Sequence, residues 1–353
     1  MLASNGKGSL YFRMTTDARD RYSRQRLLAE IGSEGQERLA ARCAAVVGCG
    51  ALGTVQAALL VRAGVGRTLL IDRDYVEESN LQRQVLFEER DAELGVPKAE
   101  AAARRLVRAN SAVTVVPVVK DLVAANAERL LESVDVILDG TDNYQTRFLV
   151  NEVAVKHCIP WIYGAAVGTH GSVMPVIPGQ TACLECIFGD APQSRQPTCD
   201  TVGVLNAVTS LIASMQVAEA LKILAGRTEA VRRELVTINI WTGERAVLHA
   251  AMPQPGCVTC GQRRFSRLRA RSAASARICG RDAVQVPGDG RPVDLAALAA
   301  SLSKLGEVRA SESAVQFSCP PHALTVFSDG RAIVKGTQDR GVARGLYARY
   351  VGG

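Results

Sequence analysis

The feature that most constrains the fold is a run of apolar residues that ends at a glycine-rich turn and leads directly into a helical pattern. Residues 42–47 read R-C-A-A-V-V, and Gly48-Cys-Gly50-Ala-Leu-Gly53 follows at once. A short apolar run is typical of a strand buried in a parallel sheet. Residues 54–63 then have apolar side chains at helical spacing. Strand, turn and helix together predict an α/β protein.

The same alternation continues along the first half of the chain. Apolar runs predict strands at 67–71, 113–119, 134–138 and 160–163, and helical spacing predicts helices at 98–108, 124–131 and 144–156. Strands that alternate with helices in this rhythm are typical of a parallel sheet with helices on both faces. We therefore expect a Rossmann-like, doubly wound sheet.

The pattern changes after residue 165. Residues 168–177 predict a strand entering antiparallel pairing, followed by a polar loop over 189–201 and a long helix over 205–224. Residues 235–241 and 245–250 predict a hairpin that turns at Thr242-Gly243. The sheet should thus be mostly parallel with an antiparallel continuation.

The last 70 or so residues predict a separate small α+β unit. Helical spacing covers 295–305 and 338–350, and two short strands at 323–327 and 331–334 are joined through Ser328-Asp-Gly330, a strong hairpin signal. The closing helix would leave only Val351-Gly352-Gly353 beyond it. Three extended residues reach roughly 10 Å, so we do not expect this Gly-Gly end to be a substrate tail.

Charge and composition exclude several classes of protein. The chain is 47% apolar and 22% charged, which excludes a disordered or fibrous chain. Its net charge of +7 equals the seven arginines between residues 263 and 281, a stretch without acidic residues. A basic surface along the whole chain, as in nucleic-acid binding, is therefore not expected. The stretch reads as a solvated linker or as a docking strip for an acidic partner.

The sequence shows no membrane or secretion signal. No run reaches the ~18 apolar residues of a membrane helix. Residues 1–20 are polar and lack the apolar core and cleavage site of a signal peptide. We expect a flexible N-terminal segment, no membrane association and a cytoplasmic protein.

Four of the ten cysteines form two regular pairs, Cys183-x-x-Cys186 and Cys257-x-x-Cys260. Without a secretion signal, a disulfide framework is disfavoured. Four thiolates suit tetrahedral Zn²⁺ in a closed structural site. The alternatives are free or disulfide-bonded cysteines, and a redox pair, which we disfavour because neither pair is expected at the start of a helix after a strand.

The glycine turn predicts a nucleotide site. Its glycines permit a tight turn, and the amide groups of the following helix can bind a phosphate. Asp72 ends the next strand, where a carboxylate can bind a ribose. This pattern alone fits NAD, FAD or ATP, or a turn without a ligand. A P-loop is excluded because no lysine followed by serine or threonine comes after the glycines.

Charged residues after Asp72 favour nucleotidyl transfer. Arg83 and Lys98 could neutralise a triphosphate, and Asp142 could hold Mg²⁺ where charge develops on pyrophosphate. An NAD-dependent oxidoreductase remains the alternative from another class. It would use the glycines and Asp72 but would leave these charges and the cysteine pairs without a role.

Over residues 21–262 the chain resembles the ThiF/MoeB/HesA family, bacterial relatives of the ubiquitin-activating enzymes. The matching motifs, in chain order, are Arg21-Tyr-Ser-Arg24-Gln25, the glycine turn, Ser79-Asn80-Leu81-Gln82-Arg83, Gly95-Val-Pro-Lys98, Thr141-Asp142-Asn143, Cys183-x-x-Cys186, Thr198-Cys199, Gln216-x-x-Glu219-Ala-x-Lys222 and Pro255-Gly-Cys257-x-x-Cys260-Gly261. The resemblance divides the chain into a flexible segment 1–20, an ATP-binding adenylyltransferase domain 21–262, a basic linker 263–281 and a small domain 282–353.

The resemblance implies an activity and its partners. Such enzymes use ATP and Mg²⁺ to adenylylate the C-terminal Gly-Gly carboxylate of a ubiquitin-fold sulfur carrier of the ThiS/MoaD type, and they carry structural Zn²⁺. The acyl-adenylate then serves thiocarboxylate formation with a persulfide donor, in thiamin, molybdopterin, cysteine or tRNA thiolation pathways. A homodimer is implied. A related branch activates a tRNA-base carboxylate, but that branch lacks the cysteine pairs.

The resemblance also assigns residues. Asp72 would bind the ribose, Asn80, Arg83 and Lys98 the phosphates, and Asp142, beside Asn143, the Mg²⁺. Arg24 would reach the ATP site of the partner subunit. Cys199 would attack the activated carrier or assist sulfur transfer, or be a loop cysteine without a catalytic part. The full nucleotide-binding set is Gly48, Gly50, Ala51, Gly53, Asp72, Ser79, Asn80, Leu81, Gln82, Arg83, Lys98, Asp142 and Asn143.

Two departures from the family are visible. Ala51 stands where many members have glycine, a small change that should preserve the backbone contact. Beyond residue 262 the resemblance ends. Some relatives carry a rhodanese domain there, but Cys319 is followed by Pro320-Pro321 and lacks the basic or glycine-rich loop of such a site. We expect a docking appendage instead.

Overall fold

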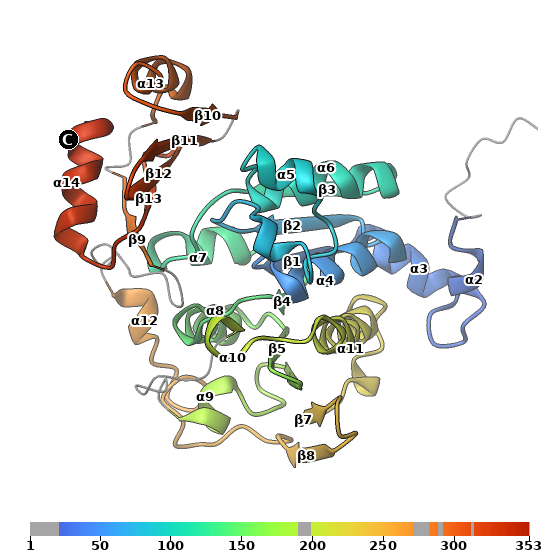
Figure 1. Cartoon of the computed structure of the whole chain (residues 1–353). Coiled ribbons are helices and arrows are strands. Elements are labelled where there is room, and N and C mark those ends of the chain that lie inside the picture. Colours follow the sequence, from blue (N-terminus) through green and yellow to red (C-terminus); the bar gives the residue numbers. More distant parts are fainter. Residues whose placement is uncertain (1–20, 190–198, 271–281, 289–291, 312–313, 353) are drawn as a thin grey trace, which may run out of the picture.

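The computed structural model describes residues 21–189, 199–270, 282–288, 292–311 and 314–352. Within these ranges the chain forms an eight-stranded sheet covered by helices and a second, five-stranded sheet beside it (Figure 1). The predicted α/β class, with an antiparallel continuation and a small C-terminal α+β unit, is confirmed.

The first sheet has the strand order β3-β2-β1-β4-β5-β6-β7-β8. The first five strands in sequence pair in parallel and the last three pair antiparallel, as the change of pattern after residue 165 predicts. The bounds are β1 (Cys43–Val47), β2 (Arg67–Ile71), β3 (Thr114–Val118), β4 (Val136–Asp139), β5 (Trp161–Val167), β6 (His170–Val176), β7 (Glu234–Asn239) and β8 (Arg245–His249).

Helices cover both faces of this sheet (Figure 1). Ala44 and Val46 of β1 pack into the core that contains α4 (Ala51–Ala63), α6 (Lys98–Ala109) and α11 (Asn206–Leu224). Ala45 and Val47 point to the opposite core, which contains α7 (Ala124–Leu131) and α8 (Tyr144–His157). Burial on both faces explains why β1 reads as a continuous apolar run.

The long helix α11 has the length and composition of a membrane-crossing helix, and it is the one such helix among the described residues. Half of that stretch is buried in the protein. It packs on α4 and on β5, so the core of the fold accounts for its apolar sequence.

Several short helices were not predicted. They are α2 (Ser23–Arg26), α3 (Gly32–Ala41), η1 (Glu78–Asn80), α5 (Glu89–Glu93), α9 (Leu184–Phe188), α10 (Cys199–Val202), η2 (Thr228–Ala230) and α12 (Ser266–Arg269). Most span one or two turns, too few residues for a periodic pattern. The end of the predicted loop 189–201 is therefore helical, which corrects that prediction, and its residues 190–198 lie outside the described ranges.

The first part of the predicted basic linker is anchored to the first sheet's helices. The buried carboxylate of Glu152 in α8 accepts hydrogen bonds from the amides of Arg267 and Leu268 at 3.1 and 3.0 Å. The Arg267 guanidinium also lies 4.5 Å from the centre of the Phe148 ring. The same guanidinium pairs with the Glu152 carboxylate at 3.3 Å, so this part of the linker packs against α8 because a buried carboxylate requires a cation. Residues 271–281 of that linker are not described.

The second sheet is antiparallel, with the order β10-β11-β12-β13-β9. Its strands are β9 (Ala283–Val286), β10 (Val308–Ala310), β11 (Ala314–Cys319), β12 (His322–Phe327) and β13 (Ala332–Lys335). The β12–β13 hairpin confirms the Ser-Asp-Gly turn, whereas β9, β10 and β11 were not predicted.

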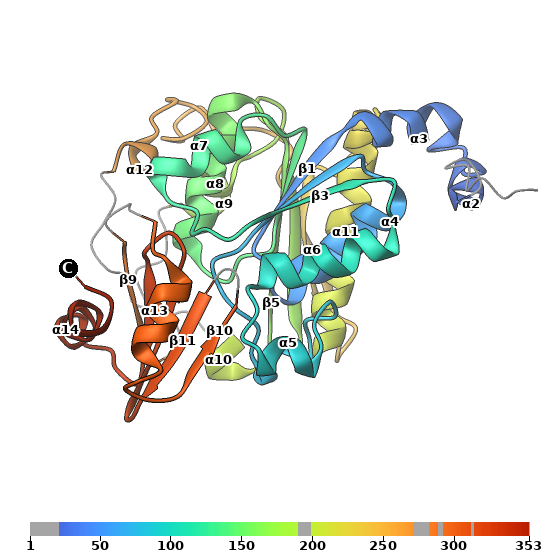
Figure 2. The same ribbon diagram turned by 90° about the horizontal axis from the view of Figure 1, so that it is seen from above.

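Two helices, α13 (Leu295–Leu302) and α14 (Arg340–Tyr350), cover one face of the second sheet, with α14 on the side away from the first unit (Figure 2). The opposite face brings Phe327 and Ile333 against Tyr75, which follows β2 of the first sheet. The two units therefore share a small apolar core.

Candidate active site

The carboxyl ends of β1, β2 and β4 meet at one edge of the first sheet, at Gly48, Asp72 and Gly140. The Asp72 carboxylate accepts hydrogen bonds from the amides of Cys49 at 2.6 Å and Asp74 at 2.7 Å. Burial raises the pKa of Asp72, and the nearby Lys98 ammonium opposes the rise. Asp72 therefore joins the glycine turn to the loop after β2.

The three glycines of the turn differ in why glycine is needed at each position. A Cβ on Gly48, whose φ is +92°, would lie 2.6 Å from the carbonyl oxygen of Gly140, and one on Gly53 would lie 1.8 Å from that of Gly48. Both glycines are thus required by close backbone packing. A Cβ on Gly50, the N-cap residue of α4, would meet no protein atom nearer than 3.9 Å.

The open space at Gly50 fits a ligand. Amide groups at the start of α4, which begins at Ala51, are the kind of donors that bind phosphate. Because the protein itself does not fill the position, the absence of a side chain at Gly50 suits the close approach of a nucleotide.

Lys98 lies at the start of α6 and is only 4% exposed. Its Nζ is 3.6 Å from Oδ2 of Asp74, and its amide donates to the Asp74 carbonyl at 2.9 Å. A buried ammonium requires an anionic partner. The loop after β2 thus supplies one carboxylate to the glycine turn and another to Lys98.

The motif 79–83 forms the turn of η1 and the residues after it. Asn80 is buried, and its Oδ1 accepts from the amide of Glu77 at 3.2 Å. The Arg83 guanidinium donates to the Ser79 carbonyl at 2.8 Å, which orients it along this turn. Ser79 and Gln82 are exposed and Leu81 is half-buried.

Asp142 is exposed and stands just before α8. Asn143 is the N-cap of that helix: its Oδ1 accepts from the amide of Thr146 at 2.8 Å, while its Nδ2 donates to Oδ1 of Asp142 at 3.2 Å. A helix cap therefore orients the carboxylate predicted to hold Mg²⁺.

Two residues that sequence reasoning missed support this loop. Arg147 forms a buried ion pair with Asp139 at 3.1 Å and donates to the Thr141 carbonyl at 2.8 Å. Its guanidinium lies 5.4 Å from the ring centres of Tyr144 and Tyr163. The sequence feature that could have indicated Arg147 is its position, five residues after the predicted metal ligand Asp142 and one turn into a predicted helix.

Arg24 belongs to α2, which lies at the edge of the first unit farthest from the second sheet (Figure 1). Its helix α2 packs at the carboxyl end of α4, where Gln25 donates to the Ala63 carbonyl at 2.9 Å. The glycine turn stands at the start of α4, 13 residues away. At 1.5 Å per residue this separation is about 20 Å. The structure thus does not bring Arg24 to the nucleotide site of its own chain.

The four paired cysteines come together. Their Sγ atoms all lie within 4.8 Å of one another, at 3.6 Å between Cys183 and Cys257 and 3.3 Å between Cys186 and Cys260. A Zn²⁺ ion with four bonds of about 2.3 Å in tetrahedral geometry would separate the sulfurs by about 3.8 Å. The cluster therefore fits a metal ion of this kind.

The first cysteine pair does stand at a helix start, contrary to the expectation from the sequence. Cys183 is the N-cap of α9, so the first pair does begin a helix that follows a strand. The case against a redox pair now rests on the convergence of all four sulfurs.

The sequence was compared with models of known protein families. The model of the ThiF family matches residues 22–259, which is more than half of the chain. The chain belongs to the ThiF family.

Two relatives of this ThiF-family chain are named as adenylyltransferases. It is 41% identical over 336 residues to a "Sulfur carrier protein ThiS adenylyltransferase" of Bacillus subtilis, covering 94% of this chain and 99% of the relative. It is 36% identical to a "Sulfur carrier protein adenylyltransferase" of Thermus thermophilus, covering 70% of this chain and 93% of that protein. The ATP complex of Escherichia coli MccB shares the fold, with a TM-score of 0.60 and 24% identity over 69% of this chain and 74% of that one.

Among the described residues, the four-sulfur cluster consists of Cys183, Cys186, Cys257 and Cys260. The backbone of Cys199 opens α10. Cys49 is buried in the glycine turn, and Cys43 is half-buried. A buried, apolar role is expected for Cys158 from the sequence, but Cys158 is exposed and stands in a left-handed conformation as the C-cap of α8. Cys319 lies half-buried in β11, and Cys279 is outside the described residues.

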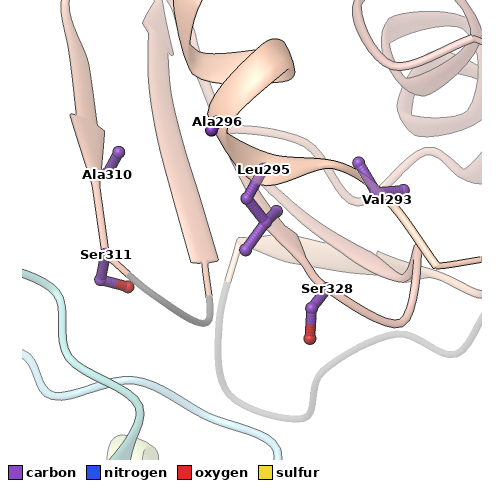
Figure 3. A pocket seen from close by; sticks show the side chains of 6 residues that line it. All are labelled: Val293, Leu295, Ala296, Ala310, Ser311 and Ser328. Carbon is purple, nitrogen blue, oxygen red and sulfur yellow. The ribbon is translucent and has the colours of Figure 1, made fainter.

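A cavity of about 610 Å³ opens in the second unit (Figure 3). Its lining side chains are small or apolar and come from the start of α13 and the segment before it, the end of β10 and the turn after β12: Val293, Leu295, Ala296, Ala310, Ser311 and Ser328. Its described lining contains no titratable side chain.

Proposed function

We propose that this ThiF-family chain is an ATP-dependent adenylyltransferase that activates the C-terminal carboxylate of a ubiquitin-fold sulfur-carrier protein. The observation that carries the proposal is the meeting of Asp72 and the buried Lys98 beside the open turn at Gly50. The names of the Bacillus subtilis and Thermus thermophilus relatives support the same activity.

In the proposed reaction, the carrier carboxylate attacks the α-phosphate of ATP, pyrophosphate leaves, and an acyl-adenylate remains. The attacking carboxylate is already ionised at pH 7, so no general base is needed. Catalysis then consists of alignment and neutralisation of charge. Lys98 and Arg83 would face the phosphates, and Asp72 would hold the ribose.

Mg²⁺ would be held by Asp142, which Asn143 orients, and would stabilise negative charge on the leaving pyrophosphate. Zn²⁺ would be held by the cluster of Cys183, Cys186, Cys257 and Cys260 in a structural role, since four thiolates leave no open coordination position.

The finer assignments are also proposals. The carrier would be of the ThiS or MoaD type and end in Gly-Gly. The terminal sulfur of a persulfide donor would attack the adenylate carbonyl and displace AMP, and a thiolate would then cleave the resulting S–S bond to release the thiocarboxylate. Cys199 would either attack the activated carrier or assist this sulfur transfer. Residues 21–262 would form the adenylylating domain and 282–353 a separate small domain.

A homodimer would complete the site. Because α2, which contains Arg24, packs at the end of α4 opposite the glycine turn, about 20 Å along that helix, we propose that Arg24 serves the ATP site of a partner subunit.

Exchange of radiolabelled pyrophosphate into ATP, with and without a panel of Gly-Gly carriers, tests the proposal. We expect exchange that depends on one of the carriers. Activation of a tRNA base instead would give exchange with tRNA and none with any carrier.

A further inference from the structure

The second unit covers the two loops that frame one side of the nucleotide site. The loop after β2 contains Asp72 and Asp74, and the loop after β3 begins at Val119. Tyr75 and Val119 pack with Phe327 and Ile333 of the second sheet. Gln285 of β9 donates to the Asp121 carboxylate at 3.2 Å. The second unit therefore packs directly on loops of the first unit beside the proposed nucleotide site.

One side chain of the second unit spans both loops. The Arg331 guanidinium donates from one terminal nitrogen to the Arg73 carbonyl at 2.9 Å and from the other to the Val119 carbonyl at 3.2 Å. Its Nε pairs with Asp329 at 3.2 Å. Arg331 is itself only 5% exposed, whereas its carboxylate partner Asp329 is partly exposed.

The position of the Arg73 carbonyl affects two residues of the proposed site. Its neighbours along the chain are Asp72, whose carboxylate bonds the glycine turn, and Asp74, whose carboxylate pairs with Lys98. A shift of the Arg73 peptide would move both carboxylates together. A guanidinium is suited to fix it, because its planar fork can bind two carbonyls at once.

Arg331 is itself held rigidly. Its guanidinium carbon lies 3.8 Å from the centre of the Phe327 ring, which belongs to the apolar core between the two units. Stacking on an aromatic face and a carboxylate on the third side leave the fork little freedom.

We propose that Arg331 is a positioning residue for ATP, through which the C-terminal domain sets the geometry of Asp72 and Lys98. This inference rests on the proposed function and adds to it, since it gives a role in ATP placement to residue 331, which lies beyond residues 22–259 of the family model and within the length shared with the Bacillus subtilis relative. The small domain would then position residues of the adenylylation site through Arg331.

The test compares Arg331→Ala and Arg331→Lys with Arg309→Ala in the full chain. Arg309 is a matched control because it also donates from the second unit to a carbonyl of the first, that of Glu93 at 3.2 Å, but at an exposed position. We measure the KM for ATP, the KM for the carrier and kcat in the exchange reaction, and the Kd of ATP by calorimetry.

We expect Arg331→Ala to raise both the KM and the Kd for ATP about tenfold, as the loss of buried charged hydrogen bonds predicts. The KM for the carrier should stay within about twofold. Arg331→Lys should be intermediate, since an ammonium cannot span two carbonyls in a fixed plane. Arg309→Ala should match the wild type.

An unchanged Kd and KM for ATP in folded Arg331→Ala would overturn the inference. So would a fall in kcat alone, in step with the folded fraction measured by thermal unfolding, because that pattern indicates a purely structural role. If Arg331→Ala does not fold, the Kd of the milder Arg331→Lys decides. A wild type that binds ATP but shows no exchange with any carrier refutes the proposed function, while the Kd values still judge Arg331.

Discussion

Arg147 and Asp139 form a buried ion pair, 3.1 Å apart, directly beneath the loop that presents Asp142. The same guanidinium donates to the carbonyl of Thr141, the residue before Asp142. A structural pair in the core thereby sets the backbone of the proposed metal ligand.

Arg147→Ala should therefore reduce both stability and exchange. It leaves Asp139 buried without its cation, a change that typically lowers the free energy of unfolding by about 3–5 kcal/mol. Denaturant unfolding measures this loss. The matched control is Arg129→Ala, a change at the exposed end of α7, which should leave the unfolding midpoint unchanged. Equal stability of the two variants would contradict the assignment.

Gly50→Ala and Gly53→Ala should separate the glycine that serves the ligand from the glycine that serves the fold. A methyl group at Gly50 has room in the protein and should leave the thermal midpoint near that of wild type while weakening ATP binding. A methyl group at Gly53 would collide with the Gly48 carbonyl and should destabilise the fold. Normal ATP affinity in Gly50→Ala would argue against phosphate at this turn.

Asp142→Ala should abolish exchange without unfolding the protein, because the side chain is exposed and its main partner is its neighbour Asn143. Loss of a group that stabilises transition-state charge typically lowers the rate at least about a hundredfold. Circular dichroism checks the fold. Near-normal exchange in the folded variant would remove Asp142 from the proposed metal site.

Arg24→Ala and Asp142→Ala chains should complement each other when mixed. In a mixed dimer one site lacks both groups and the other is intact. Equal random mixing makes half of the dimers mixed, so about a quarter of wild-type activity should return. If mixed dimers are demonstrated by native mass spectrometry and remain inactive, Arg24 does not act across a dimer.

The purified protein should contain about one zinc ion per chain. Cys183→Ser and Cys257→Ser should each lose the metal and lower the thermal midpoint, since metal binding contributes to folding free energy. Cys158→Ser, at an exposed cysteine outside the cluster, is the control and should keep the metal. Adenylylating protein free of zinc by elemental analysis would refute the structural role.

Structural features that depend on neighbouring residues in the chain could be predicted from the sequence, and features that depend on distant residues could not. The β1–turn–α4 unit was predictable because its signals are contiguous: an apolar run, glycines and helical spacing lie within 25 residues. The helical start of α9 at Cys183 and the packing of Arg267 on Glu152 were not, since each depends on partners far along the chain.

The second sheet shows the same limit. Its β12–β13 hairpin has a local turn signal, but β10 is only three residues long and has no period to read. Such a strand is defined by its partner β11 and by the core that both cover. Secondary-structure signals within a short window cannot specify it.

The sequence by itself determined the family, the order of strands and helices in the first sheet, and the residue types suited to ATP and metal. Each rests on local backbone preferences or on side-chain chemistry that a linear motif records. The tertiary structure alone decided that Gly53 rather than Gly50 is required for packing, that Arg24 stands far from its own glycine turn, and that Arg331 reaches the Arg73 carbonyl across 258 residues. Those facts depend on which surfaces are buried together, and burial is a property of the whole folded chain.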